Sequence, residues 1–83
     1  MALPHPVLDF LYERARRGGA NIPKNNDDLF KLRILDSFAL IEFLLILEEH
    51  CGIKVPDSDV LPENFQTIEI IDRFAAARWA HSP

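Results

Sequence analysis

The sequence predicts an all-α fold, a small four-helix bundle with three longer helices, one short helix and a long loop between the first and second helices. Two observations support this class: apolar residues recur at spacings of three and four along three segments, and no strand-like alternation of useful length appears. Glycine and proline separate these segments. The chain has 83 residues, of which 48% are hydrophobic and 27% charged, and both values are typical of a globular protein. We therefore expect residues 1–83 to form a single domain.

The first helix is expected from about Pro6 to Arg17. Proline suits the first turn of a helix, the arginines of the last turn suit the negative end of the helix dipole, and Gly18-Gly19 would end it. Residues 18–36 then form a connection that is long for so small a domain, and such connections are usually functional or contain hidden structure. We allow for a short helical turn near residues 28–32.

The second helix is expected from Ser37 to about Cys51, with its end at Gly52. Apart from Glu42, this segment is apolar on every side until Leu47. One buried stripe requires less apolar surface than that. Either the helix is central, or one of its apolar faces is kept for a partner.

The remainder of the chain predicts a short helix and a longer one. Residues 53–56 should be extended, because the residue before a proline avoids the helical conformation. A brief third helix is expected to begin at residues 57–59 and to be limited by Pro62. The last helix should run from about Gln66 to Ala80. Its apolar stripe is Ile68, Ile71, Ala75 and Trp79.

Charge is distributed unevenly along the chain, whose formal net charge is −4. Residues 36–69 hold eight acidic side chains against Lys54 alone, a net charge of −7, whereas residues 1–35 carry a net +2. Nucleic acid is therefore not expected as a ligand, because phosphate binding requires a basic surface. A basic protein partner fits the acidic segment better, although a solvated charged face would also explain it.

The sequence points to a cytoplasmic location. The single Cys51 cannot form an internal disulfide, and residues 1–10 lack the basic residues that open a signal peptide. The longest apolar stretch, residues 38–47, is too short to span a bilayer. We expect a cytoplasmic monomer that does not insert into membranes.

Residue types of metal and catalytic sites do not occur in the required patterns. Asp57 and Asp59 resemble the opening of a calcium loop, but no glycine or closing glutamate follows at the required spacing. No nucleophile has a plausible triad, and there is no glycine-rich phosphate loop and no helical zinc motif. We therefore predict no metal site, no catalytic residue and no enzymatic activity.

The Asp36-Ser37 dipeptide stands at the entrance to the long apolar helix. Asp or Ser before an apolar run is a normal N-cap, and most such dipeptides have no further role. If Ser37 is the cap, its removal should cost about 0.5–2 kcal/mol. The capping-box partner is absent, because Leu40 lies three residues after Ser37. Asp57-Ser58 is an internal control, since this second dipeptide leads to no long helix.

From the first helix to about Phe74, the chain resembles acyl and peptidyl carrier proteins. The motifs that carry the resemblance are Leu35-Asp36-Ser37-Phe38, Glu42, Leu47-Glu48-Glu49, Gly52-Ile53-Lys54-Val55-Pro56-Asp57 and Glu63-Asn64-Phe65-Gln66-Thr67-Ile68. The pattern is closer to small freestanding aminoacyl carriers, such as D-alanyl carrier proteins, than to carriers of fatty-acid synthesis. Two features depart from the usual pattern: Ile34 stands where many members have glycine, and Lys31 and Arg33 place positive charge before the motif.

The resemblance implies that Ser37, preceded by Asp36, is esterified by 4′-phosphopantetheine taken from coenzyme A. The thiol of that arm would carry an acyl or aminoacyl group as a thioester, and the chain would be a carrier rather than an enzyme. The partners implied are a phosphopantetheinyl transferase, an ATP-dependent acyl or aminoacyl ligase that could be akin to aminoacyl-tRNA synthetases, and a downstream acyl-accepting enzyme. A phosphodiester at a helix N-terminus is also physically favourable, because unpaired amides and the helix dipole meet it there.

Helical geometry predicts a partner-binding face on the second helix. If Leu40, Phe43, Leu44 and Leu47 face the core, the opposite stripe carries Phe38, Ile41 and Leu45, with Glu42 and Glu48 beside it. The alternative is that Phe38 and Ile41 are core residues as well. Lys31 and Arg33 either lie beside the phosphate of the arm or are solvated loop charges.

The cargo is predicted from the composition of the core. The aromatic candidates for the core are Phe10, Phe30, Phe43, Phe65, Phe74 and Trp79. Separating such a cluster to admit a long chain would lose packing contacts, so we expect a small aminoacyl cargo. The alternatives are a fatty-acid or polyketide acyl carrier and, in another class, a helical protein-interaction adaptor in which Ser37 is only a helix cap.

Overall fold

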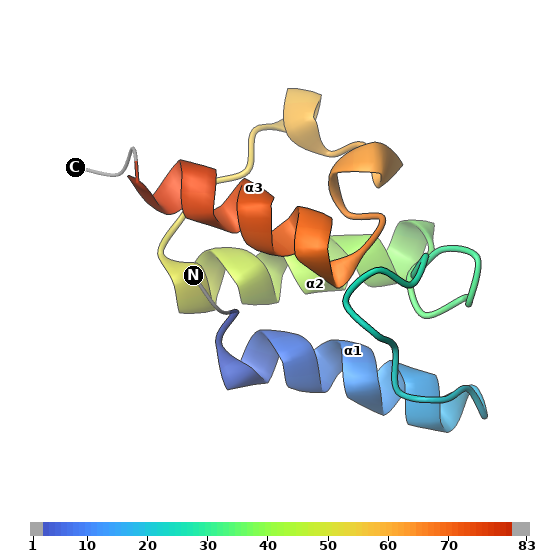
Figure 1. The fold of residues 1–83 in the computed structure, drawn as a ribbon. Helices are drawn as coiled ribbons and strands as arrows, with labels where there is room; N and C mark the ends of the chain where they lie inside the picture. Colours follow the sequence, from blue (N-terminus) through green and yellow to red (C-terminus); the bar gives the residue numbers. More distant parts are fainter. Residues whose placement is uncertain (1–2, 81–83) are drawn as a thin grey trace.

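The computed structural model describes the backbone of residues 3–80 and the side chains of residues 3–78. The described chain forms three α-helices and two 3-10 turns, with no strand within that range. The elements are α1 (His5–Arg17), α2 (Ser37–Cys51), η1 (Asp57–Asp59), η2 (Pro62–Asn64) and α3 (Ile68–Ala80). In Figure 1, α1 and α2 run antiparallel, and α3 lies on the other side of α2 from α1 in this view and runs in the direction of α2. The predicted all-α class is confirmed.

The expected fourth helix is present only as η1 and η2, two separate 3-10 turns of three residues each. Leu61, between them, is extended, with φ −125° and ψ 140°. Pro62 explains the break, because a proline disfavours helical geometry in the residue before it and has no N–H to donate. The bundle therefore has three helices and an irregular 53–67 segment.

The boundaries of the three α-helices agree closely with the sequence prediction. α1 begins one residue early, at His5, and Pro6 remains in its first turn. α2 has the expected bounds and ends at Gly52, whose φ of 65° is the left-handed conformation that glycine adopts without strain. α3 begins at Ile68, where the hydroxyl of Thr67 accepts the N–H of Ile70 at 3.0 Å.

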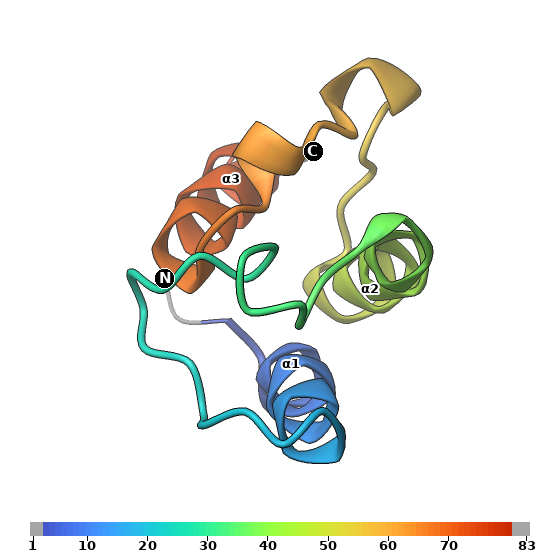
Figure 2. The ribbon, with the colours of Figure 1, turned by 90° about the vertical axis from the view of Figure 1, so that its right-hand side faces the viewer.

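The connection between α1 and α2 crosses one end of the bundle, where α1 ends and α2 and α3 begin (Figure 2). Its expected helical turn is present as hydrogen-bonded turns, in which one carboxylate oxygen of Asp28 accepts the N–H groups of Phe30 and Lys31, both at 3.0 Å. The other oxygen accepts from the Gln66 side chain at 2.9 Å, and Leu29 N–H donates to the Gln66 carbonyl at 2.8 Å. The bond from Gln66, followed by those from the turn, holds the pKa of Asp28 below its ordinary value. These bonds attach the connection to the start of α3.

The core is aromatic at its centre and aliphatic around it. Phe43 and Phe65 are fully buried, and the half-buried rings of Phe10 and Phe74 extend them into a row with centroid separations of 5.9, 6.5 and 5.1 Å. Phe30 is partly buried against the same core. The side chain of Trp79, the remaining aromatic candidate, lies outside the described residues.

No helix within residues 3–80 is both long enough and apolar enough to cross a membrane. Cys51 is buried at the end of α2, and this burial, together with the nearby charge of Asp72, raises the pKa of its thiol.

Candidate functional site

The N-terminus of α2 is capped by Asp36. This residue is extended, with φ −142° and ψ −171°, and its Oδ1 accepts the N–H of Ala39 at 2.8 Å. Its carbonyl accepts the first helical hydrogen bond, from Leu40 N–H at 2.8 Å. The hypothesis that Ser37 is the helix cap is therefore wrong, because an aspartate one residue earlier satisfies the same amide.

Ser37 is the first residue of α2 and is exposed to solvent. Among the residues that the structure describes, no protein group hydrogen-bonds to its hydroxyl. Because helical geometry leaves the first amides of a helix without intrahelical acceptors, the N–H groups of Ser37 and Phe38 are available to an anion at this end. The position fits a phosphodiester on the serine: the hydroxyl is accessible, and two unpaired amides and the positive end of the dipole lie beside it.

Arg14 of α1 reaches the segment that precedes Ser37. Its Nε donates to the carbonyl of Ile34 at 2.5 Å, and its Nη2 lies 3.6 Å from Oδ2 of Asp36. The sequence analysis did not predict this contact; Arg14 is one of the three arginines of the last turn of α1, which were expected only to interact with the helix dipole. The signal was present in the spacing, since Arg14 continues the buried face of Val7 and Leu11 at intervals of four and three.

Arg33 and Lys31 are both exposed on the turn before the site. Arg33 has a φ of 60°, in the left-handed region that non-glycine residues rarely adopt. The hypothesis that one or both of these side chains lie beside the phosphate of an arm stays a prediction.

The face of α2 opposite the core is apolar and exposed. Phe38, Ile41 and Leu45 are 85%, 55% and 63% exposed, and we call these three residues the α2 face. The exposed Glu42 lies beside them. The alternative that Phe38 and Ile41 are core residues is therefore wrong, and the expected burial of the core-facing stripe of α2 is confirmed. That stripe is Leu40, Phe43, Leu44 and Leu47.

Glu48, expected beside this face, is engaged within the protein. Its Oε2 accepts the N–H of Val55 at 2.8 Å, and its side chain is only partly exposed. The carboxylate thereby ties the last turns of α2 to the 53–56 link. Sequence periodicity could place Glu48 on the helix, but it could not reveal an acceptor role toward a residue seven positions away.

A shallow apolar groove runs beside α2 from Ser37 toward the 53–57 segment. It consists of two adjoining hollows with volumes of about 490 and 470 Å³, which share Ile41 and Val60 in their lining. The first hollow includes Ser37 and Pro62, and the second includes Val55. An arm attached to Ser37 would start at one end of this groove.

No group of three or more His, Cys, Asp and Glu side chains in the described part of the chain lies close enough together to hold a metal ion.

Comparison with known proteins gives one family match. A family model described as a phosphopantetheine attachment site matches residues 15–71, which is more than half of the chain. Neither the curated proteins nor the solved structures contain a significant match. The matched range includes Asp36, Ser37 and the whole of α2. The chain therefore belongs to the phosphopantetheine attachment site family, whose members carry 4′-phosphopantetheine as a covalent prosthetic group.

Proposed function

We propose that this chain is a carrier protein that bears 4′-phosphopantetheine on Ser37 and holds a small aminoacyl group as a thioester. The observation that carries this proposal is the exposed Ser37 hydroxyl, which stands at the start of a long helix within the range that matches the family. Asp36 supplies the cap, so the serine is not needed for the helix. The arm supplies the thiol, and the chain itself performs no catalytic step.

Attachment of the arm is a phosphoryl-type substitution on coenzyme A. A bond forms between Ser37 Oγ and the phosphorus next to the pantetheine, and the bond from that phosphorus to the oxygen of the 3′,5′-bisphosphorylated adenosine breaks. The hydroxyl proton goes to a base of the transferase. The amides of Ser37 and Phe38 and the dipole of α2 stabilise the resulting phosphodiester.

The attachment site is tested by intact-mass measurement after incubation with coenzyme A and a phosphopantetheinyl transferase. The wild-type chain should gain one phosphopantetheinyl group, and Ser37→Ala should gain none. Ser58→Ala is the matched control, because Ser58 belongs to the other Asp-Ser dipeptide, in η1, and this variant should load normally. Loading of Ser37→Ala would refute the assignment.

We propose that partner enzymes dock on the α2 face. These partners are the transferase, an ATP-dependent aminoacyl ligase akin to aminoacyl-tRNA synthetases and an acyl-accepting enzyme. Exposed apolar side chains beside the acidic Glu42 support this surface, since large apolar anchors supply affinity and charge steers association. The face lies on the same helix as the attachment serine, so docking would bring the arm to the partner.

Substitutions on α2 test this surface. Ile41→Ala and Glu42→Lys should slow loading while changing the free energy of unfolding by no more than about 0.5 kcal/mol, because both side chains are exposed. Glu49→Lys makes the same charge change near the other end of α2, about 18 Å from Ser37, and should affect loading less. Loading rates that respond neither to these changes nor to added salt would argue against the surface.

The proposed small cargo is supported by the packing of the core. The fully buried rings of Phe43 and Phe65 contact half-buried rings on both sides, so admitting an acyl chain would forfeit those contacts. A small aminoacyl group needs no such shelter. A second candidate, a carrier of longer acyl groups, is favoured by the apolar groove beside Ser37, where a chain could lie without opening the core.

Amide spectra of the chain loaded with glycyl and with octanoyl groups test the two cargoes. We expect neither group to shift the resonances of Phe43 and Phe65. Shifts of both residues by octanoyl alone would mean that the chain enters the core, and the small-cargo proposal would fail. Octanoyl shifts confined to Ile41 and Val60 would favour the second candidate.

A further inference from the structure

The segment before Ser37 is held in a strained conformation. Arg33, four residues before the serine, has a φ of 60°, in the left-handed region that is sterically unfavourable for a non-glycine residue. Such a conformation persists only where surrounding contacts determine it. Ile34 and Leu35 supply part of that determination, because both are 1% exposed and their N–H groups donate to the carbonyl of Leu29.

Arg14 supplies a second restraint, from a different helix. Its guanidinium contacts the segment at two points, the carbonyl of Ile34 and the Oδ2 of Asp36. The other oxygen of the same carboxylate accepts the capping amide of Ala39. The Asp36 carboxylate is thus held from two sides, and Arg14 restrains the chain that enters Ser37 at the carbonyl of Ile34 and at the carboxylate of Asp36.

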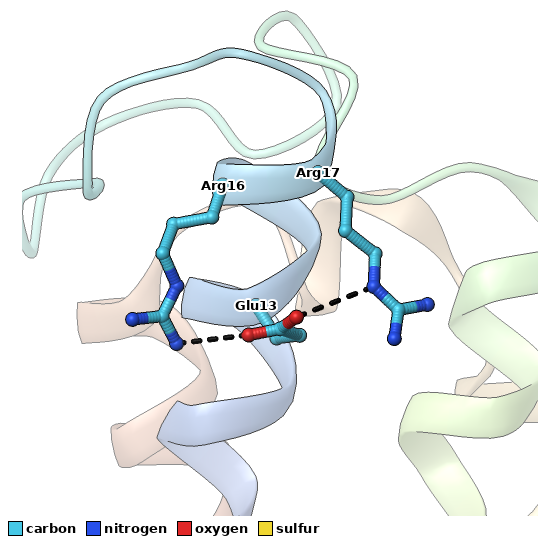
Figure 3. Close-up of polar contacts among 3 residues, drawn as sticks. All are labelled: Glu13, Arg16 and Arg17. Atoms are coloured by element: carbon cyan, nitrogen blue, oxygen red, sulfur yellow. Dashed lines mark hydrogen bonds and ion pairs between the residues drawn. The ribbon is translucent and has the colours of Figure 1, made fainter.

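The two neighbouring arginines of α1 do not act in this way. Arg16 and Arg17 both bind the carboxylate of Glu13 within the same helix, at 2.9 and 3.3 Å (Figure 3). Their side chains are 66% and 79% exposed, against 33% for Arg14. Of these three arginines, Arg14 is the one whose described contacts reach the residues just before Ser37, namely Ile34 and Asp36.

We infer that Arg14 is a positioning residue for the modification of Ser37, acting through Ile34 and Asp36. This inference rests on the proposed attachment of the arm to Ser37. The serine is the nucleophile, so its Oγ must be placed in line with the phosphorus, and a misplacement of about 1 Å can cost up to about 100-fold in rate. The described contacts of Arg14 are with Ile34 and Asp36 and not with Ser37 itself, so its contribution to the reaction lies in geometry.

The experiment measures kcat and KM for phosphopantetheinyl transfer from coenzyme A, with the chain as the varied substrate, at a temperature well below the melting transition. Arg14→Ala should lower kcat about tenfold and leave KM unchanged, because the α2 face that docks is intact. Arg14→Lys should recover part of the loss, since an ammonium keeps the charge that faces Asp36 but lacks the rigid fork whose two nitrogens contact Ile34 and Asp36. Arg16→Ala and Arg17→Ala are the matched controls, which should load within about twofold of wild type.

A double-mutant cycle with Asp36→Asn tests the route of the effect. If Arg14 acts partly through this carboxylate, Arg14→Ala should lower kcat less in the Asp36→Asn background than in wild type. A normal kcat for Arg14→Ala, an effect on KM alone, or an equal loss in the Asp36→Asn background would each overturn the inference. Should Arg14→Ala fail to fold, Arg14→Gln and Arg14→Lys are subject to the same comparison.

Failure of the inference is distinguishable from failure of the proposed function. If wild type loads on Ser37 and Arg14→Ala loads equally well, only the role of Arg14 is wrong. If wild type gains no group on Ser37, the attachment site is wrong, and the role of Arg14 falls with it.

Discussion

Arg33 offers a direct test of the strain at the entrance to the candidate site. Replacing it with glycine keeps the N–H that donates to the Phe30 carbonyl at 3.1 Å and removes an exposed side chain. The φ of 60° is strained for arginine and free of strain for glycine. We therefore expect Arg33→Gly to stabilise the protein, although substitution by glycine usually destabilises a folded protein.

The magnitude follows from two opposing terms. The left-handed conformation costs a non-glycine residue about 1–2 kcal/mol, whereas glycine loses about 0.5–1 kcal/mol more conformational entropy on folding. The midpoints of these two ranges differ by about 0.75 kcal/mol, so we expect a net gain of about 0.5–1 kcal/mol. For a domain of this size, 1 kcal/mol corresponds to about 4–8 °C, so the melting temperature should rise by about 2–8 °C.

Urea unfolding followed by circular dichroism measures the change, with an unchanged m value as the check on two-state behaviour. Arg33→Ala is the control, because alanine also removes the guanidinium but retains the strain, and it should lie within about 0.5 kcal/mol of wild type. A glycine variant that is no more stable than the alanine variant would show that the backbone of Arg33 is not strained.

Three further outcomes follow from the contacts described above. Asp36→Ala should destabilise the protein by about 0.5–2 kcal/mol through loss of the α2 cap, whereas Ser37→Ala should change the free energy of unfolding by less than about 0.5 kcal/mol. Calorimetry in which Ser37→Ala is the more destabilised variant would contradict the assignment of Asp36 as the cap. The carboxyl of Asp28 should titrate below the ordinary aspartate pKa of about 3.9, and Gln66→Ala should move the midpoint of that titration upward. Because the pKa of Asp28 is lower in the folded state than in the unfolded state, its contribution to stability is present above pH 4 and is lost as the pH falls through the folded pKa. Urea unfolding as a function of pH should show this loss in the wild-type chain and not in Asp28→Asn. The Cys51 thiol is buried and its pKa is raised in the folded state, so it should react slowly with alkylating reagents at pH 8. Its contribution to stability should be lost as the pH rises above about 8.5, because the unfolded thiol ionises in that range. Rapid labelling of the native chain would show instead that the thiol is accessible.

The sequence determined the local structure of this protein to a large extent. The bounds of α2, its end at Gly52 and the division of its residues into buried and exposed stripes were all predictable, because each depends on residues within a turn or two of one another. The short 53–67 segment was less predictable. Helix signals at Asp57 compete there with Pro62, and the outcome, two 3-10 turns, depends on how the segment packs.

The tertiary structure decided which groups meet around the candidate site. The spacing of Arg14 places it beside the buried face of α1, but the sequence does not reveal which group it meets. Of Arg14, Arg16 and Arg17, only Arg14 reaches Asp36, 22 positions away, because α1 packs beside the start of α2. The pairing of Asp28 with Gln66 likewise appears only when the α1–α2 connection crosses the start of α3. Helix periodicity and capping depend on residues that are neighbours along the chain, so both can be predicted from the sequence. Contacts between distant residues depend on the relative placement of whole helices, which is set by burial summed over the entire core.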